Sequence, residues 1–268
     1  MPELPEVETI AYNLRPALTG KIILSSDLLW KRTLAVPSPR AFSRRIRGQK
    51  IDGVGRRGKF LFLTLTGYTL LIHLRMSGDL LAILGGYQRA RHDRLILKLT
   101  EDTTFVFSDP RKFGRVWLVS DPQEVLGRLG PEPLGDEFTP DWLITQLKSC
   151  RQRLKPLLVD QEFLAGLGNI YTDEALHASK LHPLRKASDI SLGQAGDLWQ
   201  AIRMVLEDGI RKNGASIDWV YRGGDYQNQF RVYGRQGQPC PVCGNKIEKI
   251  FVAQRGTHFC PACQRLEG

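Results

Sequence analysis

The sequence predicts an α+β protein in which an N-terminal β-sandwich with a flanking helix precedes a helical domain and a small metal-binding ribbon. Three observations support this fold class. Short apolar segments with strand periodicity dominate the first part of the chain, the apolar spacing then turns helical, and two Cys-x2-Cys pairs lie near the carboxyl end. We expect domains at residues 1–130, 131–237 and 238–268, because the run 130–135 is too rich in proline and glycine to continue a helix or strand.

The periodicity assigns the individual elements. Apolar residues recur every three or four positions from Pro5 to Leu18 and predict one helix, which ends at Gly20. Strands are expected at residues 21–29, 50–54, 60–65, 68–74, 80–83, 94–99, 104–108 and 116–119. Helices are expected at residues 141–150, 156–159, 169–178 and 191–212, and the polar segment 216–237 is expected to be a mobile loop. Many short strands with tight turns are typical of a β-sandwich.

The composition indicates a globular protein with a polyanionic partner. The chain has 38 Lys and Arg against 28 Asp and Glu, a net charge of +10, and the stretch from Arg44 to Lys59 contains a single acid, Asp52. Such an excess favours nucleic acid over an anionic membrane surface. No apolar run approaches the roughly 20 residues that cross a bilayer, and the acidic start is unlike a secretory signal. We therefore expect a cytoplasmic protein without a membrane partner.

Four of the five cysteines predict a metal site. Cys240 and Cys243 are separated from Cys260 and Cys263 by sixteen residues, and each pair has the Cys-x2-Cys spacing. Four thiolates on two such turns suit one structural Zn²⁺ with no open coordination position. The fifth, Cys150, stands apart, and we expect no role for it.

The first residues, Met1-Pro2-Glu3-Leu4-Pro5-Glu6, predict a nucleophile. Removal of Met1 would leave Pro2 as a terminal secondary amine, which condenses with a carbonyl carbon to a permanently cationic iminium. The positive end of the helix dipole next to it would favour the neutral amine. Taken alone, the segment is better explained as a frayed terminus whose prolines start a helix at favoured positions, and only the rest of the chain favours the nucleophile.

Three further motifs are compatible with DNA binding but are not specific by themselves. Asp109-Pro110-Arg111-Lys112-Phe113-Gly114 fits a side-chain wedge that enters a base stack, or a charged hairpin turn. His73-Leu74-Arg75-Met76-Ser77-Gly78 fits the same face, or the end of a core strand. Gly166-Leu167-Gly168-Asn169 precedes a predicted helix and fits a phosphate cradle, or an ordinary helix cap.

Taken together, these motifs resemble those of bacterial formamidopyrimidine-DNA glycosylases over essentially the whole chain. Six motifs occur in the same order and at similar spacing: Pro2 to Thr9, Lys59 after Arg56-Arg57-Gly58, His73 to Gly78, Asp109 to Gly114, Gly166 to Tyr171, and the cysteine ribbon. The resemblance implies a β-sandwich, a helix-two-turns-helix domain with a lesion-capping loop, and a zinc ribbon. It also implies a bacterial, nucleoid-associated, monomeric base-excision repair enzyme acting on damaged duplex DNA.

The implied activity has two parts. A glycosylase, which is a hydrolase, removes 8-oxoguanine and formamidopyrimidines, and an apurinic or apyrimidinic site lyase nicks the strand by β,δ-elimination. By resemblance, Pro2 attacks C1′, Glu3 assists sugar-ring opening, Lys59 acts in β-elimination, and Arg255 grips phosphate and serves the δ step. The implied DNA-contacting residues are His73, Met76, His92, Arg111, Phe113, Arg151, Arg153, Lys155 and Asn169.

Two alternatives remain. The sister family that removes oxidised pyrimidines shares the fold, the nucleophile and the ribbon, but typically has glycine where this chain has Leu4. A non-catalytic zinc-ribbon protein would use the basic face for salt-dependent DNA binding without strand cleavage. That class gives no reason for Pro2 and Glu3 to accompany Lys59 and the wedge motifs.

Overall fold

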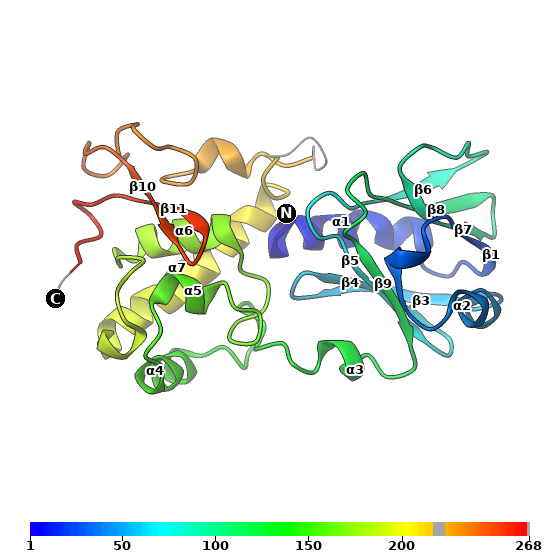
Figure 1. Cartoon of the computed structure of the whole chain (residues 1–268), viewed down its shortest axis with the longest axis horizontal. Coiled ribbons are helices and arrows are strands. Elements are labelled where there is room, and N and C mark those ends of the chain that lie inside the picture. The colour runs from blue at the N-terminus through cyan, green and yellow to red at the C-terminus, as the bar shows by residue number, and fades with distance from the viewer. Residues whose placement is uncertain (217–222, 267–268) are drawn as a thin grey trace. The chain divides into compact units, whose positions relative to one another are not determined.

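The computed structural model describes residues 1–216 and 223–266 and divides the chain into two compact units (Figure 1). Unit 1 comprises Met1–Arg128 and Ser216–Gly223, and unit 2 comprises Leu129–Ala215 and Gly224–Gly268. None of the helices in the described residues has the length and hydropathy of a membrane span.

Unit 1 is a sandwich of two sheets. The first sheet has the strand order β1-β7-β8-β6 and the second has the order β2-β9-β5-β4-β3. The strands are β1 (Ile23–Leu28), β2 (Leu34–Val36), β3 (Ile51–Arg57), β4 (Phe60–Leu65), β5 (Thr69–His73), β6 (Asp79–Leu84), β7 (Asp93–Leu99), β8 (Thr103–Ser108) and β9 (Arg115–Val119). All neighbours pair antiparallel except β2 and β9, which pair in parallel.

Helix α1 (Leu4–Leu18) packs against β3, β4 and β6 and contributes to the core of the sandwich. Its completely buried Val7 and Leu18 belong to the same apolar cluster as Phe105 and Phe107 of β8. Burial of side chains this large supplies about 1.5–3 kcal/mol each, so the start of α1 is held by the main core of unit 1.

Unit 1 also contains helix α2 (Pro39–Ile46), helix α3 (Gln123–Leu126) and the 3-10 turn η1 (Lys31–Thr33). Phe42 and Ile46 are completely buried and join the sandwich core, so α2 is anchored by one apolar edge, which contacts β1.

Unit 2 is helical with a two-stranded ribbon. Its elements are α4 (Pro140–Ser149), α5 (Leu154–Leu158), α6 (Asn169–Ala178), η2 (Ala187–Asp189), α7 (Leu192–Arg211), η3 (Tyr226–Gln229), β10 (Glu248–Val252) and β11 (Arg255–Phe259). Helix α6 is buried between α7 and β11, with every residue from Ile170 to His177 buried. Ser191 and Gln194 form a capping box that begins α7.

The eight strands, the first helix and the four later helices predicted from the sequence are confirmed, with ends that shift by up to three residues. The periodicity missed β2 and α2. The predicted loop 216–237 is only partly described, because residues 217–222 lie outside the described residues. Its later part is packed rather than free, since the ring of Tyr226 stacks on Tyr171 with centroids 5.1 Å apart.

Candidate active site

Pro2 and Glu3 occupy a fixed position at the start of α1. Both are buried, whereas Met1 is 39% exposed. The backbone N–H of Glu3 donates to the carboxylate of Glu6 at 2.7 Å, and these two residues form the capping box of the helix. The terminus predicted to carry the nucleophile is therefore part of an ordered helix start.

Lys59 lies in the turn between β3 and β4 and is 5% exposed. The preceding Gly58 has φ +56°, the left-handed conformation that this turn requires. The Arg56 guanidinium donates to the carboxylate of Glu8 at 2.9 Å and to the carbonyl of Gly58 at 3.1 Å. This bridge attaches the Lys59 turn to the first part of α1, the helix that Pro2 and Glu3 precede.

His73, at the end of β5, is buried and neutral. Its ring contacts Phe60 edge-on with centroids 4.8 Å apart, and its Nδ1 accepts the N–H of Arg75 at 3.0 Å. Burial, with added effects of the Arg75 and Lys59 charges, lowers the pKa of His73 to about 3. A neutral ring that accepts at Nδ1 carries its proton on Nε2.

Met76, Arg111 and Phe113 are exposed side chains on two loops of unit 1. Met76 follows β5, and Arg111 and Phe113 follow β8. The guanidinium of Arg111 donates to the sulfur of Met76 at 3.6 Å, so two side chains far apart in the sequence meet. Met76 is 45% exposed and Phe113 is 55% exposed, so both apolar side chains reach the solvent.

The completely buried carboxylate of Asp109 joins these two loops. One of its oxygens accepts the hydroxyl of Ser77 and the N–H of Arg111, and the other accepts the N–H of Gly114 at 2.7 Å. A Cβ on Gly114 would lie 2.3 Å from the ring of Phe107, so only glycine allows this close approach.

His92 lies in a third loop, directly before β7, and is exposed. Its carbonyl accepts the N–H of Asp109 at 2.8 Å. The buried guanidinium of Arg94 donates to the carbonyls of Asp109 at 2.8 Å, Asp93 at 3.0 Å and Arg91 at 3.3 Å. The loops that carry His92, Met76 and Arg111 are thus fastened into one platform.

In unit 2, the start of α6 is joined to the ribbon turn. The side-chain amide of Asn169 donates to the carbonyl of Gly256 at 2.8 Å. Arg255, adjacent to Gly256 at the start of β11, is exposed, as are Arg151 and Arg153 before α5. Asn169 and Arg255 are therefore brought close together by a direct contact between helix and ribbon.

Lys155 is completely buried, unlike the arginines that precede it. Its ammonium donates to the carboxylate of Asp173 at 2.5 Å and to the carbonyl of Asn169 at 2.9 Å. The second oxygen of Asp173 accepts the N–H of His258 in β11 at 2.8 Å. The structure thus places Lys155 in a buried ion pair that links α5, α6 and the ribbon.

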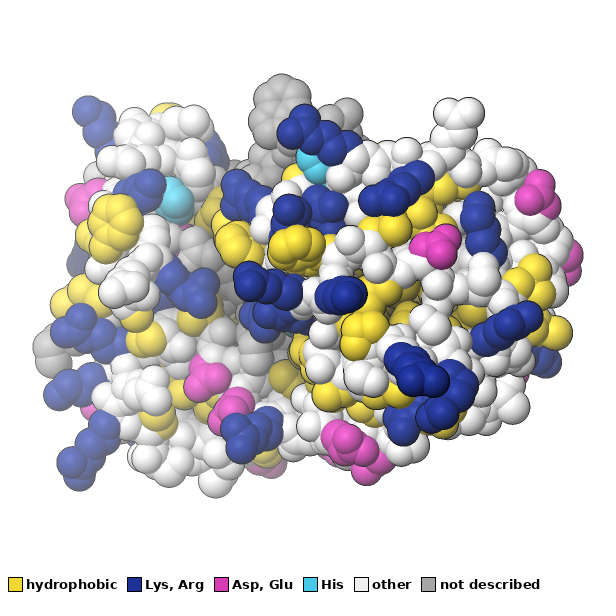
Figure 2. Space-filling view, turned by 45° about the vertical axis from the view of Figure 1, so that its right-hand side comes forward, with side chains coloured by type: hydrophobic (Ala, Val, Ile, Leu, Met, Phe, Trp, Pro, Cys, Tyr) yellow, Lys and Arg dark blue, Asp and Glu magenta, His cyan; other side chains and the backbone are white. Residues whose placement is uncertain are grey.

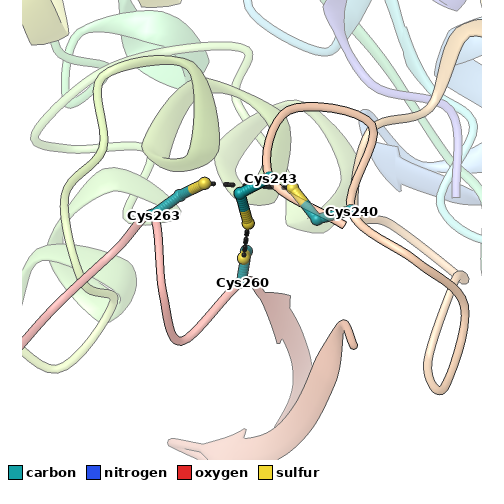
Figure 3. Close-up of side chains that lie close together, drawn as sticks. All are labelled: Cys240, Cys243, Cys260 and Cys263. Carbon is teal, nitrogen blue, oxygen red and sulfur yellow. Dashed lines mark hydrogen bonds between the residues drawn. The ribbon is translucent and has the colours of Figure 1, made fainter. Parts of the chain in front are cut away.

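The four cysteines of the ribbon converge on one point (Figure 3). Their Sγ atoms all lie within 4.8 Å of one another, with 3.4 Å between Cys243 and Cys260 and 3.9 Å between Cys240 and Cys263. A tetrahedron with zinc–sulfur bonds of about 2.3 Å has sulfur–sulfur distances of roughly 3.8 Å. The set therefore fits one zinc ion bound by protein ligands alone.

Helix α6 also holds the ribbon from outside the metal site. Nε2 of His177 lies 3.4 Å from Sγ of Cys240. The buried carboxylate of Glu174 accepts the N–H groups of Arg231, Val232 and Tyr233 at 2.8–3.0 Å. Burial raises the pKa of Glu174, and the three donors act against that shift.

Comparison with known families agrees with this architecture. Three family descriptions match in order: the formamidopyrimidine-DNA glycosylase N-terminal domain at residues 1–116, the formamidopyrimidine-DNA glycosylase H2TH domain at residues 129–220, and a zinc finger found in FPG and IleRS at residues 237–266. The chain belongs to the formamidopyrimidine-DNA glycosylase family.

Curated relatives and solved structures cover the full length. Formamidopyrimidine-DNA glycosylase of Protochlamydia amoebophila is 43% identical over 99% of this chain and 100% of its own. That of Chloroflexus aggregans is 46% identical over 99% of each. The Lactococcus lactis enzyme bound to DNA that contains an abasic site is 36% identical, with a TM-score of 0.92 over 98% of this chain and 100% of its own.

Several residues that hold the site in place were not identified from the sequence. Arg56 was named only in the basic stretch and in the motif that precedes Lys59, with no partner predicted, and Arg94, Asp173 and Glu174 were assigned no role. One sequence feature points to the last two: they are adjacent acids in the middle of a predicted helix of a basic chain, which suggests that they have partners. No comparable pattern marks Arg56 or Arg94, whose partners come from distant segments.

Proposed function

We propose that this chain is a base-excision repair enzyme that removes 8-oxoguanine and formamidopyrimidines from duplex DNA and then cuts the strand as an abasic-site lyase. Membership of the formamidopyrimidine-DNA glycosylase family supports the glycosylase. A solved relative, the Lactococcus lactis enzyme in complex with DNA containing an N7-benzyl-Fapy-dG, supports the purine-derived lesion; it is 35% identical with a TM-score of 0.93.

The first step uses Pro2 after removal of Met1. The lone pair of the proline nitrogen attacks C1′ of the damaged nucleotide, the glycosidic bond breaks, and the base leaves with its bonding electrons and is protonated. The attacking nitrogen gives up its N–H proton. Glu3 donates a proton to the ring oxygen O4′ as the C1′–O4′ bond opens, which leaves a cationic iminium between Pro2 and C1′.

The iminium then serves as the electron sink for strand cleavage. Loss of a proton from C2′ drives β-elimination of the 3′ phosphate, assisted by Lys59. A second elimination, served by Arg255, expels the 5′ phosphate and leaves a one-nucleotide gap. The buried position of Lys59 beside neutral His73 supports a role close to the reacting sugar rather than on the outer surface.

The remaining residues bind DNA. Met76, Arg111 and Phe113 fill the space that the extruded nucleotide leaves, which offsets part of the few kcal/mol that unstacking costs. His92, Arg151, Arg153 and Asn169 contact phosphates, and the zinc ion holds the ribbon that carries Arg255. His73 and Lys155 support these contacts from buried positions, and the enzyme acts as a monomer.

One observation carries this proposal: Pro2 and Glu3 directly precede a helix that the Arg56–Glu8 bridge ties to the Lys59 turn. The bridge joins Glu8, in the first part of the helix, to the carbonyl of Gly58, the residue directly before Lys59. This contact supports the proposal, because it connects the helix that follows Pro2 and Glu3 to the turn that carries Lys59.

Borohydride trapping tests the proposal. Processed protein, confirmed by intact mass to lack Met1, is mixed with duplex DNA that contains one 8-oxoguanine, and the reduced covalent adduct is quantified. Pro2→Gly is expected to abolish most of the adduct, whereas Pro5→Gly, a matched loss of proline in the same segment, is expected to retain it.

Two outcomes would change the proposal. Adduct mainly on a matched dihydrouracil duplex would indicate the pyrimidine-directed activity of the sister family. Active protein with Met1 still attached would refute Pro2 as nucleophile, because its nitrogen would then be an amide.

A further inference from the structure

Helix α2 carries a strongly basic face that the proposed chemistry does not use. Between Asp27 and Asp52 the sequence contains no acid, and all seven of its lysines and arginines are exposed. Four of the seven lie on α2 or directly after it: Arg40, Arg44, Arg45 and Arg47.

These four arginines have no ion-pair partner among the described residues. Asp52, the acid nearest to them in the sequence, pairs with Lys50 at 3.6 Å. Arg45 lies over the ring of Tyr68, with 5.9 Å between its guanidinium carbon and the ring centroid. Arg40 and Arg44 are at i and i+4 on α2, and Arg47 is its C-cap residue at i+7, so the three side chains leave the backbone on one side of the helix.

This arrangement costs the isolated helix stability. Like charges at i and i+4, such as Arg40 and Arg44, destabilise a helix by about 0.2–0.5 kcal/mol. Arg44 and Arg45 are in the last turn, where the helix dipole favours cations, but Arg40 is in the first turn, where the dipole disfavours them. The dipole therefore explains only part of the cluster, and a bound polyanion would relieve the repulsion that remains.

The basic face is distant from the proposed nucleophile within unit 1. Figure 1 shows α2 at the opposite end of the unit from the N-terminus, where it packs on β1 through Phe42 and Ile46. Figure 2, which brings that end forward, shows Lys and Arg side chains gathered in groups with few acidic side chains near them. The buried edge of α2 anchors the helix, so its arginines are presented on a fixed support.

We propose that Arg40, Arg44, Arg45 and Arg47 bind the phosphate backbone of a second segment of duplex DNA while a lesion-containing duplex occupies the active site. Arginine suits this role because its planar guanidinium binds phosphate oxygens in pairs. Contacts to phosphates alone carry no sequence information, so the second segment is undamaged DNA of any sequence. This proposal depends on the proposed function in one respect: the chain must bind lesion DNA at a different site.

A two-duplex binding experiment tests this surface. The enzyme is saturated with an unlabelled short duplex that carries a tetrahydrofuran abasic analogue, and a fluorescent undamaged duplex is then titrated at low salt. Wild-type protein is expected to bind the second duplex. A plot of log affinity against log salt concentration should have a negative slope of about 0.9 for each phosphate that the protein contacts. The triple variant R40Q/R44Q/R47Q is expected to bind it at least tenfold more weakly.

A charge-matched control separates the local surface from net charge. The variant K148Q/R211Q/K212Q removes three cations from unit 2 and is expected to bind the second duplex like wild type. No second-duplex binding by wild type, or equal binding by wild type and R40Q/R44Q/R47Q, would overturn the proposal. Excision of the base from a short duplex that contains 8-oxoguanine is a separate readout. The variant R40Q/R44Q/R47Q is expected to retain excision. A wild-type protein that does not excise the base would count against the proposed function and not against this surface.

Discussion

The hydroxyl of Ser77 donates a hydrogen bond to the buried carboxylate of Asp109, and this contact joins the loop after β5 to the loop after β8. The same carboxylate accepts N–H groups from Arg111 and Gly114. Both carboxylate oxygens of Asp109 thus accept hydrogen bonds. The buried carboxylate therefore helps to set the relative positions of Met76 and Arg111, exposed side chains of the two loops.

Asp109→Asn is expected to loosen both loops. An asparagine presents one amide N–H₂ where the carboxylate presents an oxygen, so at least one buried donor loses its acceptor, at about 1–3 kcal/mol of unfolding free energy. Misplacement of the proposed wedge should slow excision of 8-oxoguanine by roughly ten- to a hundredfold. Single-turnover excision and urea unfolding measure the two effects.

Ser77→Ala provides the control for this prediction, because the Arg111 N–H still donates to Asp109 at 3.2 Å. Its loss of stability and excision rate should be smaller than that of Asp109→Asn. An Asp109→Asn protein with wild-type stability and excision would show that the loops are positioned without this carboxylate.

The sequence was sufficient for elements whose own residues determine them. The strand at 60–65 and the helix at 169–178 were predicted with the observed ends, because alternation and helical spacing are local patterns. The cysteine cluster was equally accessible, since its spacing encodes two metal-binding turns. Helix α2 was missed although Ser38 and Pro39 form a helix start, because its arginines were interpreted only as a charge cluster.

Contacts between distant residues were not accessible in the same way. Lys155 was expected to contact DNA because its position matches the family, yet its ammonium is buried against Asp173, eighteen residues away. Whether a lysine reaches solvent depends on packing between α5, α6 and the ribbon, which no local pattern records. The pairing of Arg56 with Glu8, across forty-eight residues, is of the same kind.

Lys155 and Arg153 should therefore respond differently to substitution. Arg153→Gln removes an exposed cation and is expected to lower the salt dependence of DNA affinity by about 0.9 in log–log slope. Lys155→Met leaves the carboxylate of Asp173 without its cation and is expected to cost about 3–5 kcal/mol of stability, with an unchanged slope. Affinity measured over a salt series, together with urea unfolding, distinguishes the two, and a reduced slope in Lys155→Met would indicate direct phosphate contact.

The buried imidazole of His73 predicts a pH dependence of stability. Its pKa is about 3 in the folded protein and 6.5 in the unfolded chain, so between these values the unfolded state binds more protons. The contribution of neutral His73 is complete above pH 6.5 and is lost as the pH falls toward 3. The control is His73→Asn, which keeps an acceptor for the Arg75 N–H. From pH 7 to pH 5, the unfolding free energy of wild type should fall by about 2 kcal/mol more than that of His73→Asn. Equal losses in both proteins would show that folding does not lower the pKa of His73.

The zinc ribbon has a very small apolar core of its own. The buried residues that form it are Val232, Cys240, Ile247 and Cys260. Two of the four are metal ligands, so the core cannot be separated from the metal site. Because structural zinc contributes about 10–16 kcal/mol in small modules, the ion is expected to be the main reason that β10 and β11 hold Arg255 in place.

Cys260→Ser is accordingly expected to reduce bound zinc below one ion per chain and to weaken binding of abasic-analogue DNA at least tenfold, because the ribbon carrying Arg255 loses its support. Cys150→Ser is the matched control, since this half-buried thiol lies outside the cluster. It should retain one zinc and wild-type affinity. Metal analysis and fluorescence anisotropy on the same preparations measure both quantities. A Cys260→Ser protein that keeps a full zinc complement and wild-type affinity would mean that the four thiolates are not the ligands that hold the ribbon.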